Sequence, residues 1–326
     1  MSKIALFDPY QLKFMGNAVD WWRTKGYEVK WEPYYNPELV MWADVVFFHT
    51  CDNNLNSATN PDQALKDEWK YTNRPGAWDM HEMDLTGKKI IVQPIDIEVW
   101  NGSHAKENMW NVVTDCIFIA PHIRDLMMAD SRPQESKMKL HTIPFSVNPD
   151  KWTFKERKPG FNIAVVAETW ESKGIDYVLQ IALKLKQIDK RYKITYVGKN
   201  QDYQWHQAYR AEFIKNNKLP IKFIEWVDNL DEFLEDKNYL LHASIKEAFS
   251  AITAEAAAKG IRPVLHAFGG YEPLWGDSGW IWQGIDEAVD MITDMDYDSH
   301  SYRDYLYAKG YTTNQMMEQI EAVIHG

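Results

Sequence analysis

Short apolar runs recur along this chain and alternate with stretches of helical pattern. Runs without polar alternation are typical of strands that a sheet buries on both faces, and intervening helices suit parallel crossovers. The sequence therefore predicts an α/β fold with parallel sheets covered by helices. In the first half the predicted strands lie in KIALF (3–7), YEVKWEPY (27–34), ADVVFFHT (43–50), KKIIVQP (88–94), DCIFIA (115–120) and KLHTIPF (139–145).

A second series of the same kind begins after the Lys/Pro-rich segment KERKPG (155–160). Its predicted strands are FNIAVVAE (161–168), YKITYVG (192–198), IKFIEWV (221–227), NYLLHAS (238–244) and RPVLHA (262–267), with helices between them. We expect two doubly wound domains, at 1–157 and 158–300, with C-terminal helices at 301–326 packing back toward the first. A long polar loop without helical or strand period is expected at 51–86.

Charge is unevenly distributed along the 326 residues, whose net charge is −11. Residues 1–158 carry 19 Lys and Arg against 22 Asp and Glu, or −3, so the remainder carries −8. The second half is thus excluded as a nucleic-acid surface, while the first could face a polyanion at little cost. No run reaches transmembrane length, MSKIALFDPY does not have a signal-peptide pattern, and the cysteines (51 and 116) lie in apolar surroundings, so a cytoplasmic protein is expected.

Three polar or small-residue segments follow predicted strands of the second half: AETWESKG (167–174), KEAFSAITAE (246–255) and AFGGYEP (267–273). Carboxyl ends of parallel strands are where such folds bind ligands. Ser250 is a plausible N-cap of a helix at 251–259, whose free N–H groups favour an anion. Lys173 adds a cation suited to phosphate, and Glu255 an acceptor suited to sugar hydroxyls. A phosphate-bearing ligand with a sugar is expected here.

The second half resembles the retaining GT-B glycosyltransferases of family GT4, over nearly all of residues 140–285. Their signature of two glutamates separated by seven residues is present as E247-AFSAITA-E255. The flanking pieces that agree in order are IPFSVNPDKW (143–152), SKG (172–174), YVG (196–198), FIEWV (223–227), GIRPV (260–264) and GG (269–270).

This resemblance implies a GT-B fold, with two Rossmann-like domains facing a central cleft, the first binding the acceptor and the second a nucleotide-sugar, with UDP-sugar favoured. It further implies retention by front-face attack, with no metal or other cofactor required. Glu247 would contact the donor sugar and Lys173 the leaving phosphate. The remaining donor contacts that it implies are Glu255 at the ribose, Phe249, Ser250 and Ala251 through backbone N–H groups, and Glu168, Val227 and Gly16.

Several positions depart from the family pattern. Glu168 stands where the family often has an arginine, so a phosphate contact is missing or comes from Arg262 or Lys246. Met15-Gly16-Asn17 occupies the place of a glycine-rich loop. Asp96 or His104 would replace a histidine of the first domain; Asp96 is the catalytic candidate, although it could equally cap a turn, and His104 is an acceptor-side candidate.

The acceptor is the open question. A composition rich in Asn, Asp, Lys, Tyr, Trp and Met is similar to that of T4-like phage proteins, whose relatives of this fold add sugars to hydroxymethylated cytosine in DNA. The leading expectation is therefore a DNA acceptor, with a flipped base contacted by Trp69, Arg74 and Trp78. Alternatives are a cell-envelope glycan or lipid acceptor, a non-catalytic nucleotide-sugar-binding protein, and a sugar phosphorylase or epimerase. The DMDYD segment (294–298) is interpreted as a solvated acidic turn and not as a metal site.

Overall fold

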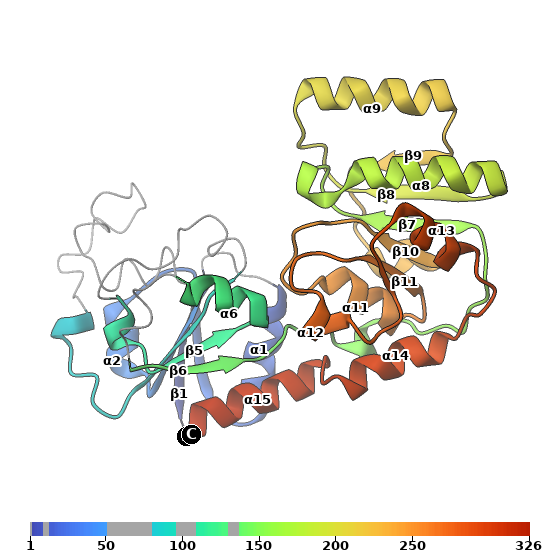
Figure 1. The fold of residues 1–326 in the computed structure, drawn as a ribbon. Coiled ribbons are helices and arrows are strands. Elements are labelled where there is room, and N and C mark those ends of the chain that lie inside the picture. Colours follow the sequence, from blue (N-terminus) through green and yellow to red (C-terminus); the bar gives the residue numbers. More distant parts are fainter. Residues whose placement is uncertain (1, 9–12, 51–79, 96–108, 130–136) are drawn as a thin grey trace. The chain divides into compact units, whose positions relative to one another are not determined.

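The computed structural model describes residues 2–8, 13–50, 80–95, 109–129 and 137–326 (Figure 1). The chain divides into two compact units. The first contains Met1–Phe145 together with Thr313–Gly326, and the second contains Ser146–Thr312. Chain crossings between the units therefore fall at two points, after Phe145 and after Thr312.

The described part of the first unit contains a six-stranded sheet in the order β2-β1-β3-β4-β5-β6. Every pairing in it is parallel. Its strands are β1 Lys3–Phe7, β2 Glu28–Glu32, β3 Val45–His49, β4 Lys89–Gln93, β5 Asp115–Phe118 and β6 Lys139–Thr142. Its helices are α1 Lys13–Thr24, α2 Pro37–Trp42, α6 Pro121–Met128 and α15 Thr313–His325, with short 3-10 turns η1 Met80–Glu82 and η2 Met109–Val112.

The last helix of the chain is part of the core of this first unit. Apolar residues of α15 pack with α1 and with the inward side chains of the central strands, and Tyr27 donates a hydrogen bond to Glu321 at 3.0 Å. Figure 1 shows α15, in red, beside the blue helix α1. The shared cluster includes Ile4, Leu6, Phe47, Ile91 and Ile117 from the strands, Met15, Val19 and Trp22 from α1, and Met316, Met317, Ile320, Val323 and Ile324 from α15.

In the second unit the described sheet again has six strands, in the order β12-β11-β10-β7-β8-β9, all parallel. The strands are β7 Asn162–Val166, β8 Lys193–Val197, β9 Ile221–Ile224, β10 Tyr239–His242, β11 Arg262–His266 and β12 Ile281–Trp282. The helices are α8 Ile175–Ile188, α9 Gln204–Asn217, α10 Leu230–Phe233, α11 Ala251–Ala258, α12 Glu272–Trp275, α13 Ile285–Thr293 and α14 Ser299–Ala308, and the 3-10 turns are η3 Pro149–Lys151 and η4 Glu171–Lys173.

Helices α8 and α13 cover one face of this sheet with an apolar layer that includes Val178, Ile181, Leu185 and Ile292. Helix α8 forms because its apolar residues recur at helical spacing, so that one face is buried and the other is polar. The predicted α/β class with two parallel, helix-covered sheets is confirmed. Among the described residues, no helix is both long and apolar enough to cross a membrane.

The division between the units differs from the predicted boundary at 157/158, because residues 146–158 bond to the second unit. Val147 forms a parallel bridge with Thr312, and Arg157 donates from Nη1 to the carbonyls of Glu235 and Lys237, both at 2.8 Å. The predicted C-terminal segment 301–326 also divides, since α14 belongs to the second unit and α15 to the first.

Candidate functional site

Three loops of the second unit meet at the carboxyl edge of its sheet. They follow β7, β10 and β11, which are neighbours in the strand order. Ile245 N donates to Ser172 O at 2.9 Å, which joins the loop after β10 to the turn η4. The segments AETWESKG, KEAFSAITAE and AFGGYEP therefore lie at one edge, as the strand pattern predicts for adjacent parallel strands.

Two glycines permit the close approach of these loops. Gly174 has φ 65°, and a Cβ on it would lie 2.0 Å from the carbonyl oxygen of Ala243. Gly198 has φ 157°, and a Cβ on it would lie 1.8 Å from Ala167 O. Because both contacts are with backbone, no side-chain movement could relieve them. The glycines of SKG and YVG are thus required by backbone packing at the edge of the sheet.

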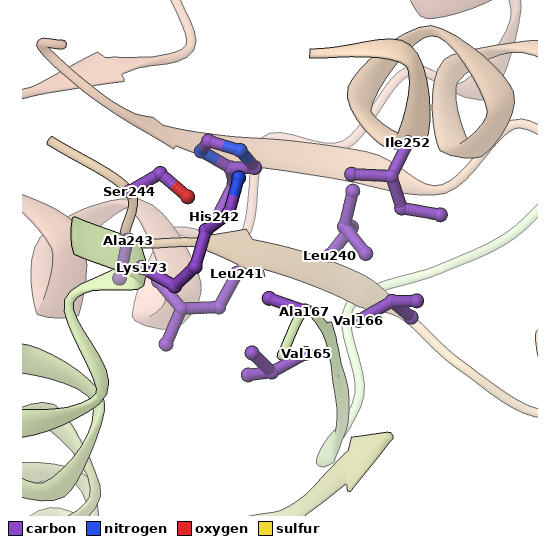
Figure 2. A pocket seen from close by; sticks show the side chains of 10 residues that line it. All are labelled: Val165, Val166, Ala167, Lys173, Leu240, Leu241, His242, Ala243, Ser244 and Ile252. Carbon is purple, nitrogen blue, oxygen red and sulfur yellow. The ribbon is translucent and has the colours of Figure 1, made fainter. Parts of the chain in front are cut away.

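Lys173 and Glu247 form an ion pair at this edge. Lys173 Nζ lies 2.6 Å from Glu247 Oε1, and the two side chains are 28% and 15% exposed. His242, the last residue of β10, places Nε2 3.3 Å from the same oxygen. Figure 2 shows Lys173, His242 and Ser244 as the polar side chains of a pocket otherwise lined by apolar residues of β7 and β10, of the positions just after these strands, and of α11.

The environment of Glu247 favours its ionised form. Burial alone would raise the pKa of this carboxyl, but the hydrogen bond and charge of His242, followed by those of Lys173, lower the pKa to about 2. Glu247 therefore holds a nearly buried negative charge at neutral pH. Such a group can accept hydrogen bonds from sugar hydroxyls but cannot donate a proton at that pH.

Helix α11 begins at this pocket in a way that the sequence did not predict. Ser250 is at the N-cap position, but its backbone is left-handed, with φ 66°, and its side chain accepts no backbone N–H. Its Oγ instead lies 2.7 Å from Thr253 Oγ1. Ser250 therefore occupies the predicted N-cap position, but the predicted capping hydrogen bond to its side chain is wrong. The left-handed backbone directs the hydroxyl along the helix instead. N–H groups of a first helical turn have no intrahelical acceptor, so an anion could bind them.

Phe249 anchors the loop that precedes α11. It is 2% exposed, its ring packs against Trp275 and Tyr311 with centroids 5.1 and 5.0 Å away, and its carbonyl accepts from Trp275 Nε1 at 2.8 Å. This fixes the backbone between Glu247 and α11. Ala251 opens α11, and Glu255, partly buried, lies on its second turn.

Other predicted donor residues of the second unit lie outside the Lys173–Glu247 pair. Both oxygens of Glu168 accept hydrogen bonds at 2.8 Å, from Trp170 Nε1 and from Gln201 Nε2, so this exposed carboxylate braces two loops. Arg262 bonds to Asp294 and to the carbonyl of Asp296. It is therefore engaged by the acidic turn at 294–298. Val227, partly buried, follows β9.

Of the site residues predicted in the first half, Gly16 is the one that lies within the described residues. Gly16 lies within α1, so the expected loop is helical there, and among the described residues a Cβ on Gly16 would meet Trp31 Cη2, at 3.9 Å. The described neighbours therefore leave room for a side chain at this position, and the donor contact of Gly16 stays a prediction. The remaining candidates, Asp96, His104, Trp69, Arg74 and Trp78, lie outside the described residues.

Two residues at the end of β3 have unusual environments that the sequence did not predict. His49 is fully buried, with Nδ1 3.1 Å from Gln93 Oε1, and burial lowers its pKa to about 4, so the imidazole is neutral at physiological pH. Thr50 has φ 89°, which costs energy for a β-branched residue. Strand-end position in ADVVFFHT was the only sequence signal for either residue.

One cluster in the second unit has metal-ligand side chains close together. Glu171, Asp202 and His206 bring their ligand atoms within 4.8 Å of one another. Arg210, which is buried, already pairs with Asp202, and His206 Nδ1 lies 3.1 Å from Asp202 Oδ1 and 3.2 Å from Glu171 Oε1. These contacts account for the cluster as an ion-pair network that ties α9 to the loops before it.

One family model matches most of the second unit. Residues 148–285 match the sequence model described as Glycosyl transferases group 1. The match lies within the second unit and covers less than half of the chain. It confirms the predicted resemblance over this unit and the prediction that the protein is a glycosyltransferase. No curated protein matches the sequence.

Solved structures with the same fold extend over both units. A glycosyltransferase from Rickettsia africae ESF-5 has a TM-score of 0.69 at 12% identity, with 99% of this chain and 97% of that chain covered. Anabaena Alr3699/HepE in complex with UDP and glucose has a TM-score of 0.67 at 12% identity, with both chains covered in full. Sucrose-phosphate synthase (tll1590) from Thermosynechococcus elongatus has a TM-score of 0.68 at 12% identity, covering 100% and 98%. At these identities the likeness shows the fold, and the predicted GT-B fold is confirmed.

Proposed function

We propose that this protein is a retaining glycosyltransferase that transfers a sugar from a nucleotide-sugar, with UDP-sugar favoured, to an acceptor hydroxyl. The observation that carries the proposal is the Lys173–Glu247 pair beside the start of α11, inside the family-matched segment. The solved structure of HepE with UDP and glucose supports a donor of this class. Retention rests on the resemblance to family GT4.

Cleavage of the bond between sugar and diphosphate develops negative charge on the leaving phosphate. A positioned cation and a helix N-terminus both stabilise such charge, and a fixed environment makes them effective in the transition state. In the proposed complex, Lys173 Nζ and the backbone N–H groups of Phe249, Ser250 and Ala251, at the start of α11, face the diphosphate. They supply the positive charge that the departing group requires.

The two glutamates of the signature have separate roles in this proposal. Glu247, ionised and nearly buried, accepts hydrogen bonds from hydroxyls of the donor sugar. Glu255, on the second turn of α11, accepts hydrogen bonds from the ribose. Their separation along one loop and helix lets them hold the two sugar rings on opposite sides of the diphosphate.

The donor is tested by incubating the protein with UDP-, GDP- and ADP-sugars and measuring released nucleotide by chromatography. We expect release from at least one donor, with losses of about 10²-fold or more in Glu247→Gln and Lys173→Met. Lys190→Met is the matched control, because Lys190 is exposed and precedes β8 at the opposite edge of the sheet. Equal rates in all four proteins would refute the assigned site.

For the acceptor, we propose hydroxymethylated cytosine in DNA. Its support is the phage-like composition, together with Trp69, Arg74 and Trp78 as candidate base contacts, while the net charge of −3 over residues 1–158 does not favour a polyanion. Digestion of treated DNA followed by nucleoside mass measurement tests it. A sugar-sized mass gain that Glu247→Gln abolishes is expected. Nucleotide release without such a gain would direct the search to cell-envelope glycans and lipids.

A non-catalytic binding protein of the same fold is the second candidate. It is favoured by Glu168, which stands at an arginine position of the family and is occupied by Trp170 and Gln201. Donor binding measured by calorimetry, without nucleotide release under any acceptor condition, would support this candidate over the enzyme.

A further inference from the structure

His242 is in contact with the proposed donor-binding glutamate, although nothing in the family signature includes it. Its side chain is 4% exposed, and Nε2 lies 3.3 Å from Glu247 Oε1. The same oxygen receives Lys173 Nζ at 2.6 Å. One carboxylate oxygen thus has two cationic or N–H-bearing neighbours, from two different elements, η4 and β10.

The two ring nitrogens of His242 have different surroundings. Its Nδ1 is buried and has no hydrogen-bond partner in the part of the chain that the structure describes. A proton on Nε2 can be donated to Glu247, whereas a proton on Nδ1 would be buried without an acceptor. The contact therefore favours the tautomer that donates to the carboxylate.

Charged, titratable and aromatic groups from three elements lie around the contact between His242 and Glu247. His266, from β11, directs Nδ1 to the carbonyl of Ser244 at 3.1 Å. The ring of Phe268 lies 6.4 Å away, centroid to centroid. The titratable groups around this contact therefore include Lys173 from η4, His266 from β11 and Glu247 itself.

Donor binding would weaken the ion pair between Lys173 and Glu247. Under the proposed function, Lys173 contacts a diphosphate, whose charge competes with the carboxylate for the ammonium. Glu247 is only 15% exposed, and a carboxylate deprived of its counter-charge at such a place is strongly destabilised. His242 is the neighbour that stays with Glu247, because it lies at the end of a central strand and not on the phosphate-binding turn.

We infer that His242 is a positioning residue for the proposed transfer: by donating from Nε2 to Oε1, it keeps the Glu247 carboxylate ionised and oriented while Lys173 binds the donor phosphate. The inference rests on the proposed function and adds to it a residue outside the glutamate signature. Figure 2 shows the side chains of His242 and Lys173 extending toward each other.

The experiment compares His242→Leu, His242→Gln and His300→Leu with the wild-type protein. Glutamine can donate an N–H to the carboxylate, whereas leucine fills the space without a donor. His300, exposed on α14, is the matched control. Donor KM and kcat are measured by nucleotide release between pH 4 and pH 8, and folding is checked by circular dichroism.

We expect His242→Leu to raise the donor KM about tenfold and to move the acid limb of kcat/KM upward by about one pH unit, because Glu247 then protonates more easily. His242→Gln should recover most of both effects, and His300→Leu should match the wild type. An acid limb in His242→Leu identical to that of the wild type would overturn the inference, as would a glutamine variant as impaired as the leucine variant.

A measurement without turnover separates this inference from the proposed function. The ¹³C carboxyl resonance of Glu247, assigned by its loss in Glu247→Gln, is titrated in the wild type and in His242→Leu. A higher pKa in the leucine variant supports the contact even if no nucleotide-sugar is consumed. An unchanged pKa rejects the inference even if the protein is an active glycosyltransferase.

Discussion

Glu247 carries a nearly buried negative charge, and two neighbouring side chains keep it ionised and in place. Lys173 and His242 both face Oε1, so the carboxylate stays ionised and fixed in the absence of ligand. At the scale of single residues, the site is a pre-formed arrangement of charge. Pre-formed charge is the feature by which enzymes stabilise a transition state at little reorganisation cost.

The ion pair predicts non-additive effects on catalysis. Lys173→Met and Glu247→Gln should each lower kcat/KM by about 10² to 10³, since each removes a charged contact with the donor. The double variant should be little worse than the poorer single variant, because each single change already disturbs the partner. A double-mutant cycle of nucleotide release checks this. Losses that simply multiply would show that the two side chains act independently.

Lys259 makes a different kind of charged contact. It is fully buried, with Nζ 2.5 Å from Asp231 Oδ1, 3.2 Å from Thr153 O and 3.4 Å from Glu235 Oε2. It therefore connects α11 and α10 to the segment that enters the second unit. Loss of one partner from a buried pair typically costs about 3–5 kcal/mol.

We accordingly expect Lys259→Met to destabilise the second unit by about 3 kcal/mol at pH 7. Burial raises the pKa of Asp231, but bonds from Lys259 and Thr153 lower it overall, and Lys155 and then Lys259 lower the pKa of Glu235. Stability from such carboxyls is full above their ordinary pKa of about 4 and is lost as pH falls further. Urea midpoints at pH 7 and pH 3.5 check this: the acid loss should be smaller in the variant. Equal acid losses would contradict the assigned network.

At the scale of elements, the loops after the strands are fitted to one another through backbone contacts. Gly174 separates Lys173 from α8 and packs on Ala243 O, so it sets the distance between the lysine and the loop that carries Glu247. The position of the phosphate-binding lysine therefore depends on a residue without a side chain.

Gly174→Ala should destabilise the second unit by more than about 1 kcal/mol, because the positive φ is strained for alanine and the added Cβ meets backbone. Donor binding should weaken in the same variant, since Lys173 is displaced. Gly284→Ala is the control, because a Cβ there meets no described atom within 4 Å and φ is −105°. Thermal unfolding and calorimetry measure both quantities. A Gly174→Ala protein as stable as the control variant would refute the packing argument.

Most strands and helices of the second unit could be predicted from the sequence. Apolar runs such as KITYV coincide with β8, and Gly260 ends the helix that holds Glu255. The left-handed backbone of Ser250 could not be predicted, because distant residues such as Trp275 fix the preceding loop. His242 was missed for a similar reason: its role depends on the fold bringing it to Glu247, and a histidine inside NYLLHAS has no local signature.

At the scale of the whole molecule, the chain returns to its first unit at the end. α15 supplies Met316, Met317 and Ile320 to the same apolar cluster as Met15 and Trp22 of α1. The sequence indicated helices at 301–326 but not which of them belongs to which unit. Side-chain periodicity shows that a helix has an apolar face, and only the folded chain shows what covers that face.

Removal of Thr313–Gly326 should therefore destabilise the first unit and leave the second unit folded. The deletion exposes the apolar faces of α1 and of the sheet. In the intact protein, large side chains such as Trp22 and Phe47 are buried there. Limited proteolysis with mass spectrometry checks this: we expect rapid cleavage within 1–145 and a surviving fragment near 146–312. Early loss of the second unit would contradict the division of the chain.

The central claim is that a nucleotide-sugar reacts at the Lys173–Glu247 edge of the second unit. Its most direct test is the rate of UDP release from UDP-sugars by the wild-type protein and by Glu247→Gln, with Lys190→Met alongside. We expect saturable release by the wild type and the lysine control, and a loss of about 10²-fold or more in Glu247→Gln. Release that is indifferent to Glu247→Gln, or no binding of UDP-, GDP- or ADP-sugars at millimolar concentration, would contradict it.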